Sequence, residues 1–212
     1  MAVDLQVIYN TLLTQYGKQY WWPAETRDEV VIGAILTQNT NWMNVSKAIE
    51  NLKQRGFCSL VAISNIDIDS LAYLIRPSGY FNQKASKLKD FACSIDLDEL
   101  NALDLNKARV ILLKKNGIGP ETADSILLYA LNKPIFVIDA YTIRLFSRLG
   151  LILKDTKYQT FQDYFMKNLN HDVELFNEYH ALIVKHCVIH CKKKPLCEAC
   201  CLEYVCEIAI NS

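Results

Sequence analysis

The eight cysteines of this chain are distributed unevenly, with six of them between positions 187 and 206. Four of the six have the spacing C-x5-C-x2-C-x5-C, and they are Cys191, Cys197, Cys200 and Cys206. Four thiolates so close in sequence predict one tetrahedral sulfur site, which suits a [4Fe–4S] cluster or a structural zinc ion. Zinc sites more often pair two tight C-x2-C units across a longer loop, and here only the middle pair is tight. We therefore predict an iron–sulfur cluster and keep structural zinc as the alternative.

A basic loop made of Lys192, Lys193 and Lys194 fills the first interval between these cysteines. Metal binding at both ends would hold the loop rigidly, and clustered lysines attract phosphate. The loop is therefore our strongest candidate for a phosphate-binding patch. The two remaining cysteines of the region, Cys187 and Cys201, are expected to be small buried hydrophobic residues.

A second group of residues could bind phosphate through its backbone. The apolar stretch 110–112 runs into Gly117, Ile118 and Gly119, and a new apolar helical pattern starts at Pro120. Glycines allow positive φ and close backbone approach, and proline suits the first helical position because its missing N–H would be unpaired there. The pattern predicts a helix-hairpin-helix whose exposed amides bind an anion such as phosphate. An ordinary helix corner with a glycine cap remains the alternative.

Helical periodicity runs through nearly the whole chain and must position these groups. Apolar residues recur at helical spacing in the segments 7–13, 30–36, 45–52, 71–75, 82–92, 105–113, 161–169 and 182–186. Only residues 134–138 read as a strand, and this segment is so short that we expect an extended connector. The sequence therefore predicts an all-α fold.

No repeat, low-complexity tract or flexible linker marks a domain boundary, so any division has to come from helix packing. We expect a six-helix domain, residues 24–134, that ends in the hairpin. Residues 1–23 and 135–212 would form a second helical domain. Such a division would put the hairpin and Asp139 on facing sides of a cleft.

The composition describes a globular chain without net charge. Of its 212 residues 51% are hydrophobic, and 23 basic residues balance 23 acidic ones. This balance argues against a protein that coats nucleic acid nonspecifically, so local patches must bind any phosphate. Further lysines are expected mainly to form solvated faces, and these are Lys84, Lys87, Lys89, Lys114 and Lys115. No run of about 20 apolar residues and no signal-like N-terminus occurs, so we expect no membrane span, a cytoplasmic location and, by default, a monomer.

The hairpin, an aspartate about twenty residues after it and the C-terminal cysteines together resemble the endonuclease III-like branch of the helix-hairpin-helix (HhH-GPD) DNA glycosylases. The resemblance covers about residues 28–212. It rests on the cysteines and on four stretches in order, namely Leu36-Thr-Gln-Asn-Thr40, Gly79-Tyr-Phe-Asn-Gln-Lys-Ala85, Gly117-Ile-Gly-Pro-Glu-Thr-Ala123 and Val137-Ile-Asp-Ala-Tyr141. The resemblance implies a base excision repair enzyme that flips a damaged base out of double-stranded DNA and cuts its N-glycosidic bond.

The resemblance also assigns roles at two positions. The essential aspartate of the family falls on Asp139, whose carboxylate would stabilise the oxocarbenium-like sugar and orient or deprotonate the attacking water. Asp139 could instead, or in addition, cap the helix that runs through Arg144. Members with a second, strand-cleaving activity carry a hairpin lysine that forms a Schiff base, and here that position is Glu121. We therefore expect a monofunctional glycosylase without AP lyase activity.

Aromatic residues suggest which base is removed. Four stretches look most like the 3-methyladenine DNA glycosylase (III) subgroup, and they are Trp21-Trp-Pro23, Leu36-Thr-Gln-Asn-Thr40, Arg76-Pro-Ser-Gly79 and Gly117-Ile-Gly-Pro-Glu-Thr-Ala-Asp124. Some members of that subgroup lack the cysteines. This likeness places Trp21, Trp22, Pro23 and Trp42 around the base, because aromatic faces attract cationic bases. Residues expected to contact DNA, some of them filling the vacated gap, are Gln38, Asn39, Tyr80, Gly117, Ile118, Gly119, Thr122 and the three lysines 192–194.

Two other functions remain open at this point. One is an endonuclease III-like glycosylase for oxidised or mismatched bases, which would need polar groups to read base edges, whereas the predicted pocket is mainly aromatic. The other is a noncatalytic iron–sulfur DNA-binding module. Asp139 argues against the module, because phosphate binding has no use for a carboxylate.

Overall fold

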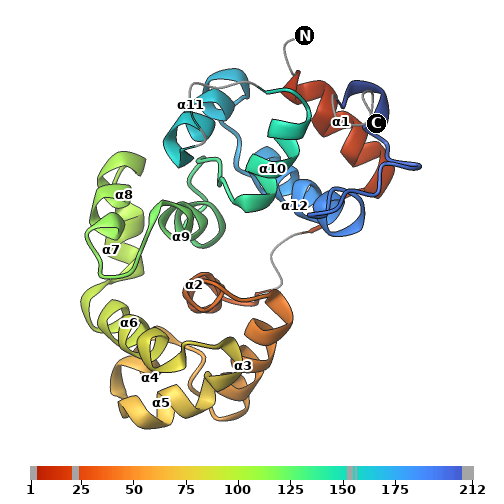
Figure 1. Ribbon diagram of the computed structural model, residues 1–212. Coiled ribbons are helices and arrows are strands. Elements are labelled where there is room, and N and C mark those ends of the chain that lie inside the picture. Colours follow the sequence, from red (N-terminus) through yellow and green to blue (C-terminus); the bar gives the residue numbers. More distant parts are fainter. Residues whose placement is uncertain (1–3, 21–23, 152–154, 156, 207–212) are drawn as a thin grey trace. The chain divides into compact units, whose positions relative to one another are not determined.

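The computed structural model describes residues 4–20, 24–151, 155 and 157–206, and in this part of the chain the regular structure is helical, without strands (Figure 1). The predicted all-α fold is thereby confirmed. Residues 134–138, which read as a short strand, form an extended connector. None of the described helices is long and apolar enough to cross a membrane.

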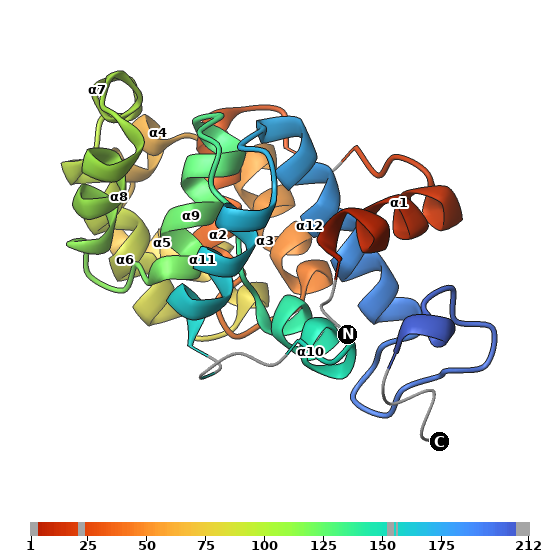
Figure 2. The same ribbon diagram turned by 90° about the horizontal axis from the view of Figure 1, so that it is seen from above.

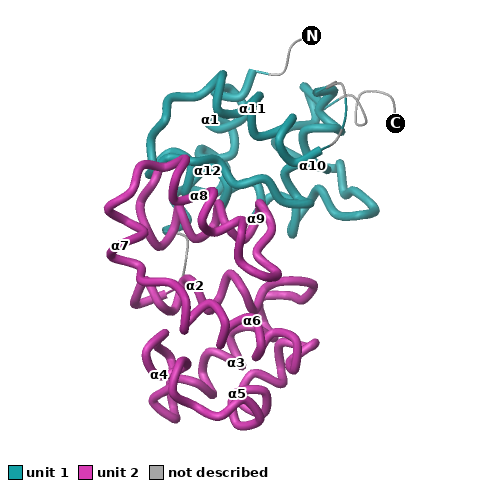
Figure 3. Tube along the Cα trace, turned by 90° about the vertical axis from the view of Figure 1, so that its left-hand side faces the viewer, with its two compact units in different colours: residues 1–21, 134–212 teal, residues 22–133 magenta. Residues whose placement is uncertain are grey.

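The chain divides into two compact units, coloured separately in Figure 3. One unit is formed by Met1–Trp21 with Pro134–Ser212, and the other by Trp22–Lys133. The predicted domain limits, 24 and 134, lie beside these boundaries. The hairpin and Asp139 therefore belong to different units.

Residues 22–133 form a helical unit around α2 (Arg27–Leu36). Glu29 to Leu36 of α2 are all buried, which is the pattern of a central helix. It packs against α3, α6 and the π-helical turn η2. The other elements of the unit are α3 (Trp42–Gln54), α4 (Leu60–Asn65), α5 (Ile68–Leu74), η1 (Arg76–Ser78), α6 (Phe81–Ser94), α7 (Leu97–Ala102), α8 (Leu105–Leu113), α9 (Pro120–Ser125) and η2 (Ile126–Ala130).

Two short helices of this unit, α4 and α7, were not predicted, because six residues are too few to show a helical period. Their start signals are nevertheless present in the sequence. Ser59 accepts a hydrogen bond from the backbone N–H of Ala62, and Asp96 accepts from those of Asp98 and Glu99. Such side-chain caps satisfy amides that have no partner within the helix.

The other unit contains α1 (Leu5–Tyr16), α10 (Ala140–Arg148), α11 (Tyr158–Asn168), α12 (Val173–Ile189) and η3 (Glu203–Val205). Helix α1 packs against α12, as the view in Figure 2 shows. The core is a cluster of aromatic rings in which Phe136 lies 4.3 Å from Phe165 and 5.8 Å from Tyr179 between centroids. Tyr179 is fully buried, and its hydroxyl donates to the backbone carbonyl of Leu5.

An ion pair with a buried carboxylate fixes the two helices of the hairpin to each other. Arg109 of α8 donates to both carboxylate oxygens of Asp124 of α9, at 2.7 and 3.0 Å, and Asp124 is completely buried. Two parallel bonds to one carboxylate form the strongest kind of side-chain hydrogen bonding. The pair therefore holds the hairpin in one geometry.

Replacing Asp124 should destabilise the protein strongly. In Asp124→Asn the Arg109 guanidinium loses its charged partner, and we expect the free energy of unfolding to fall by about 3 kcal/mol or more. The control is Asp98→Asn, which breaks the Arg27–Asp98 pair, whose side chains are 45% and 83% exposed. That change should cost under about 1 kcal/mol. Urea unfolding of both variants tests the difference, and equal midpoints would contradict it.

Candidate active site

Hairpin geometry depends on Gly117. This residue has φ +73°, a value that side chains disfavour, whereas Gly119 has φ −88° and caps α9. Only one of the two glycines thus uses the positive φ that both allow. A Cβ atom on Gly117 would also overlap Cδ and Cε of Lys87, whose side chain lies across the turn. Ile118 between the glycines is buried and holds the turn to the core.

Gln38 is hydrogen-bonded to the hairpin in this structure. Its Nε2 donates to the Gly117 carbonyl at 2.9 Å and to Thr122 Oγ1 at 3.1 Å. Its Oε1 accepts from Lys87 Nζ at 2.9 Å. The structure therefore brings together three predicted DNA contacts, Gln38, Gly117 and Thr122, and adds Lys87, which the sequence did not single out for this role.

A buried lysine joins two segments that were predicted to contact DNA. Lys84 of α6 is 2% exposed, and its Nζ donates to the carbonyls of Leu36 and Ser78 at 2.8 and 2.7 Å. Burial, followed by the charge of Lys87, lowers the pKa of Lys84 to about 8. The two bonds fix the end of α2, just before Gln38, to the turn just before Tyr80.

The expectation of solvated lysine faces is wrong for Lys84, which is buried, and incomplete for two other lysines. Lys87 is bound to Gln38, and Lys89 donates to the Ile66 carbonyl. The helix turns each amine toward a backbone or amide oxygen far away in sequence, which a count of charges cannot reveal.

Tyr80 and Asn39, the other predicted DNA contacts of this unit, are exposed. Tyr80 is 66% exposed with φ +46°, and Asn39 is exposed with φ +55°. Positive φ is uncommon for residues with side chains, and here two such residues fall in segments predicted to contact DNA.

Trp42 is the first residue of α3 and is partly exposed. The other predicted residues of the base pocket, Trp21, Trp22 and Pro23, lie outside the described residues. Glu121, in the first turn of α9, is exposed. Lys115, which precedes the hairpin, donates instead to the Ser94 carbonyl.

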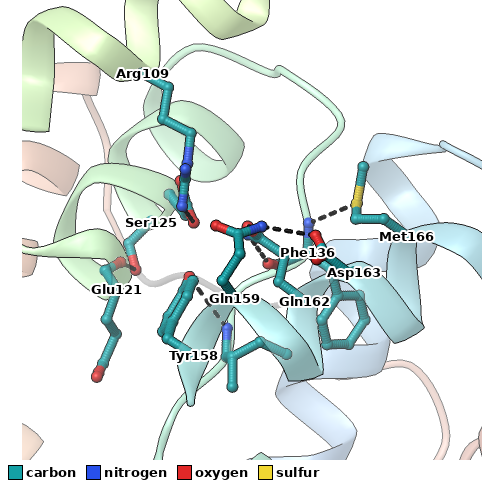
Figure 4. Close-up of polar contacts among 11 residues, drawn as sticks. Arg109, Glu121, Ser125, Phe136, Tyr158, Gln159, Gln162, Asp163 and Met166 are labelled. Atoms are coloured by element: carbon teal, nitrogen blue, oxygen red, sulfur yellow. Dashed lines mark hydrogen bonds and ion pairs between the residues drawn. The ribbon is translucent and has the colours of Figure 1, made fainter.

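The connector before Asp139 is held by side chains of α11 (Figure 4). Phe136 N–H donates to Met166 Sδ, Gln162 Nε2 donates to the Phe136 carbonyl at 2.8 Å, and Ile138 N–H donates to the Tyr158 hydroxyl. An extended segment without a neighbouring strand has to satisfy its backbone groups in this way. The side chains of α11 thereby set where Asp139 begins α10.

Asp139 is the N-cap of α10, as one sequence interpretation expected. Its Oδ1 accepts from Thr142 N–H at 2.7 Å and from Thr142 Oγ1 at 2.8 Å. Its Oδ2 lies 3.5 Å from Nε2 of His180, which α12 contributes. Asp139 and His180 are 9% and 6% exposed, so the carboxylate and the imidazole are largely shielded from water.

The surroundings of Asp139 favour its charged form. Burial alone raises the pKa of a carboxyl group, but the nearby charge of His180 and the hydrogen bonds from Thr142 help to outweigh it, so the pKa of Asp139 is lowered. A shielded carboxylate that stays ionised can stabilise a developing positive charge, because the low local dielectric strengthens the attraction.

The four predicted metal ligands line one cavity. Cys191, Cys197, Cys200 and Cys206 surround it together with Arg148, His186, His190, Pro195 and apolar residues of α10 and the C-terminal loop. As placed, no group of three or more His, Cys, Asp and Glu side chains among the described residues could hold a metal ion. The four thiols thus share one cavity.

Arg148 joins this cavity to α10. Its Nη1 contacts Cys191 Sγ at 3.2 Å and the Lys192 carbonyl at 2.6 Å, and its Nη2 donates to the Lys193 carbonyl at 2.9 Å. These bonds turn the loop carbonyls inward, while the side chains of Lys192 to Lys194 are exposed.

The pKa values of two thiols in the cavity are shifted in opposite directions. The neighbouring Cys187 and Arg148 lower the pKa of Cys191. Burial raises the pKa of Cys200 to about 11. Cys187 is buried as predicted, whereas Cys201 is only partly so.

Comparison with known proteins identifies the family of this chain. The profile described as HhH-GPD superfamily base excision DNA repair protein matches residues 32–171, well over half of the chain. The chain belongs to the HhH-GPD superfamily. It is accordingly a DNA glycosylase of base excision repair.

Proteins similar to this HhH-GPD protein are named as glycosylases or as endonuclease III. It is 52% identical over 206 residues to the candidate DNA repair glycosylase MJ1434 of Methanocaldococcus jannaschii, with 94% of each chain covered. It is 32% identical over 185 residues to endonuclease III of Sulfolobus acidocaldarius, covering 86% of this chain and 82% of that one. Among solved structures, H. pylori 3-methyladenine DNA glycosylase (MagIII) bound to 1,N6-ethenoadenine matches with 29% identity and a TM-score of 0.71. That match covers 86% of this chain and 96% of the other.

The two hairpin glycines of this HhH-GPD chain should respond differently to substitution. Gly117→Ala places a side chain at positive φ and displaces Lys87, so we expect a loss of about 1–2 kcal/mol in the free energy of unfolding. Gly119→Ala is the control, because nothing lies within 4 Å of its added Cβ. It should cost under about 1 kcal/mol, the effect of a poorer helix cap. Thermal unfolding of both variants measures this order, and a reversed order would refute the assignment of strain to Gly117.

Proposed function

We propose that this protein is a monofunctional DNA glycosylase that acts as a single chain on double-stranded DNA. Its substrate would be an alkylated base of the 3-methyladenine kind, flipped out of the duplex and released by hydrolysis of its N-glycosidic bond. The observation that carries the proposal is Asp139, a shielded carboxylate held in its ionised form by Thr142 and His180. The same residue follows the hairpin at the position of the family's essential aspartate.

In the proposed reaction Asp139 acts on the sugar. As the bond from C1′ to the base nitrogen breaks, its electron pair leaves with the base and positive charge develops on the sugar ring. Asp139 stabilises this charge and orients or deprotonates the water whose oxygen then bonds to C1′. An alkylated base is already cationic and needs little acid catalysis to leave. Trp42 is proposed to stack on it, since aromatic faces attract cations.

Strand cleavage is not part of the proposal, because the position of the family's hairpin lysine is Glu121. A carboxylate cannot form an imine with the opened sugar. The likeness to a 3-methyladenine glycosylase supports the alkylated substrate, since that relative is named for such a base. The alternative, an endonuclease III-like enzyme for oxidised or mismatched bases, is favoured by the 32% identity to an endonuclease III.

We further propose that the four cysteines hold a [4Fe–4S] cluster, with structural zinc as the alternative. The donor set fits such a group, because four thiols line one cavity and Arg148 beside Cys191 favours a thiolate. The role of the group would be to hold the C-terminal loop. That loop would then present Lys192, Lys193 and Lys194 to the phosphates of DNA.

Single-turnover release of base tests the reaction. Duplexes carrying 3-methyladenine, 8-oxoguanine or thymine glycol are incubated with excess protein, with and without later alkali. We expect release of 3-methyladenine only, strand breaks only after alkali, and a rate lower by at least about a hundredfold in Asp139→Asn. Strand breaks without alkali would show lyase activity, and a full rate in Asp139→Asn would exclude Asp139 as the catalytic carboxylate.

Metal analysis tests the cluster. Protein purified without oxygen should contain about four iron and four sulfide ions per chain and absorb in the visible range. Cys197→Ser should lose this absorbance, whereas Cys93→Ser, which alters an exposed cysteine outside the cavity, should retain it. Stoichiometric zinc without iron would support the alternative instead.

A further inference from the structure

A lysine from another helix lies across the hairpin turn. A Cβ atom on Gly117 would overlap Cδ and Cε of Lys87 and would lie 3.0 Å from its Nζ, so the bare glycine gives this side chain its place. Gln38 holds the amine there, because its Oε1 accepts from Lys87 Nζ at 2.9 Å while its Nε2 donates to the Gly117 carbonyl. The ammonium group of α6 is therefore fixed at the turn.

The positive charge of Lys87 has no negative partner within the described part of the chain. No carboxylate there forms an ion pair with Lys87 or with Lys84. Burial and then the charge of Lys87 lower the pKa of Lys84 to about 8, so the two amines are close enough to repel each other. Two neighbouring cations without a counter-ion make the local potential positive, and such a potential attracts an anion.

Lys87 also keeps hydrogen-bond donors for an anion. An ammonium group has three N–H donors, and Gln38 takes one of them. Lys87 is partly exposed and Gly117 is exposed, so a ligand from solvent can reach this place. The neighbours of the amine, Gln38 and Gly117, are both predicted DNA contacts, and the anions that DNA presents are its phosphates.

We propose that Lys87 binds a phosphate of the DNA backbone at the hairpin turn. The inference rests on the proposed binding of double-stranded DNA. Lys87 supplies the charge and two N–H donors, and Gln38 keeps the flexible side chain in place beforehand. The same charge offsets that of Glu121, an exposed carboxylate that follows the turn.

A phosphate contact positions the duplex and reads no base, so Lys87 should contribute to the binding of every lesion duplex alike. It should also release counterions from the DNA, which makes its contribution depend on salt. A lysine that only supported Gln38 would instead change the affinity by the same factor at every salt concentration.

The experiment is the salt dependence of binding to a duplex with a tetrahydrofuran abasic-site analogue, followed by fluorescence anisotropy. Lys87→Met keeps the aliphatic stem across Gly117 but removes the charge, so the slope of log Kd against log salt concentration should fall by about 0.9. Lys87→Arg should keep the wild-type slope. The control is Lys107→Met, which removes an exposed charge at the end of α8 away from the hairpin and should also keep that slope.

The outcomes separate this inference from the proposed function. If the wild type binds no duplex, both fail. If the wild type binds and Lys87→Met keeps its slope, only the inference fails. A reduced slope in Lys87→Met supports the phosphate contact even if no lesion base is released, and in that case only the proposed reaction fails.

Should Lys87→Met not fold, acetylation of wild-type lysines decides, with the modified peptides measured by mass spectrometry. The abasic duplex should protect Lys87 from acetylation and leave Lys107 reactive. Equal acetylation of Lys87 with and without the duplex would overturn the inference.

Discussion

The start of α10 holds the negative charge of the Asp139 carboxylate away from water. A carboxylate in that position would be driven to take up a proton unless donors compensate for the lost hydration. Here two donors come from Thr142, three residues along the same helix, and the third neighbour comes from His180 on α12. The connector anchored on α11 and the packing of α10 against α12 both serve to bring these groups together.

The other unit has the complementary arrangement, a shielded positive charge. Lys84 is surrounded by backbone, and its amine is held by carbonyls of two segments that are far apart in sequence. Each unit thus contains a buried ionic group whose partners fix a segment predicted to act on DNA. Replacing either group by an apolar residue would leave polar partners unsatisfied, which is more damaging than losing the favourable contact itself.

Local patterns in the sequence predicted much of this architecture. Helical periodicity predicted α8 and the helix after Pro120, and the cysteine spacing predicted the four residues that share a cavity. The Asp139 cap also has a local signal, because its donor Thr142 is three residues away. The contacts of Gln38 and His180 join residues that are 79 and 41 positions from their partners. No spacing rule covers such distances, since they depend on how the helices pack.

The hydrogen bonds of Gln38 have a consequence for discrimination between damaged and intact DNA. In this structure the amide of Gln38 has three partners, so the side chain would have to give up three hydrogen bonds before it could enter a duplex as predicted. A helix with all its bases stacked offers nothing in exchange, whereas a vacated position exposes the polar edge of the orphaned base. If Gln38 fills the vacated gap as predicted, breaking these bonds would cost free energy that intact DNA does not offset, and discrimination against intact DNA would begin before any base reaches a pocket.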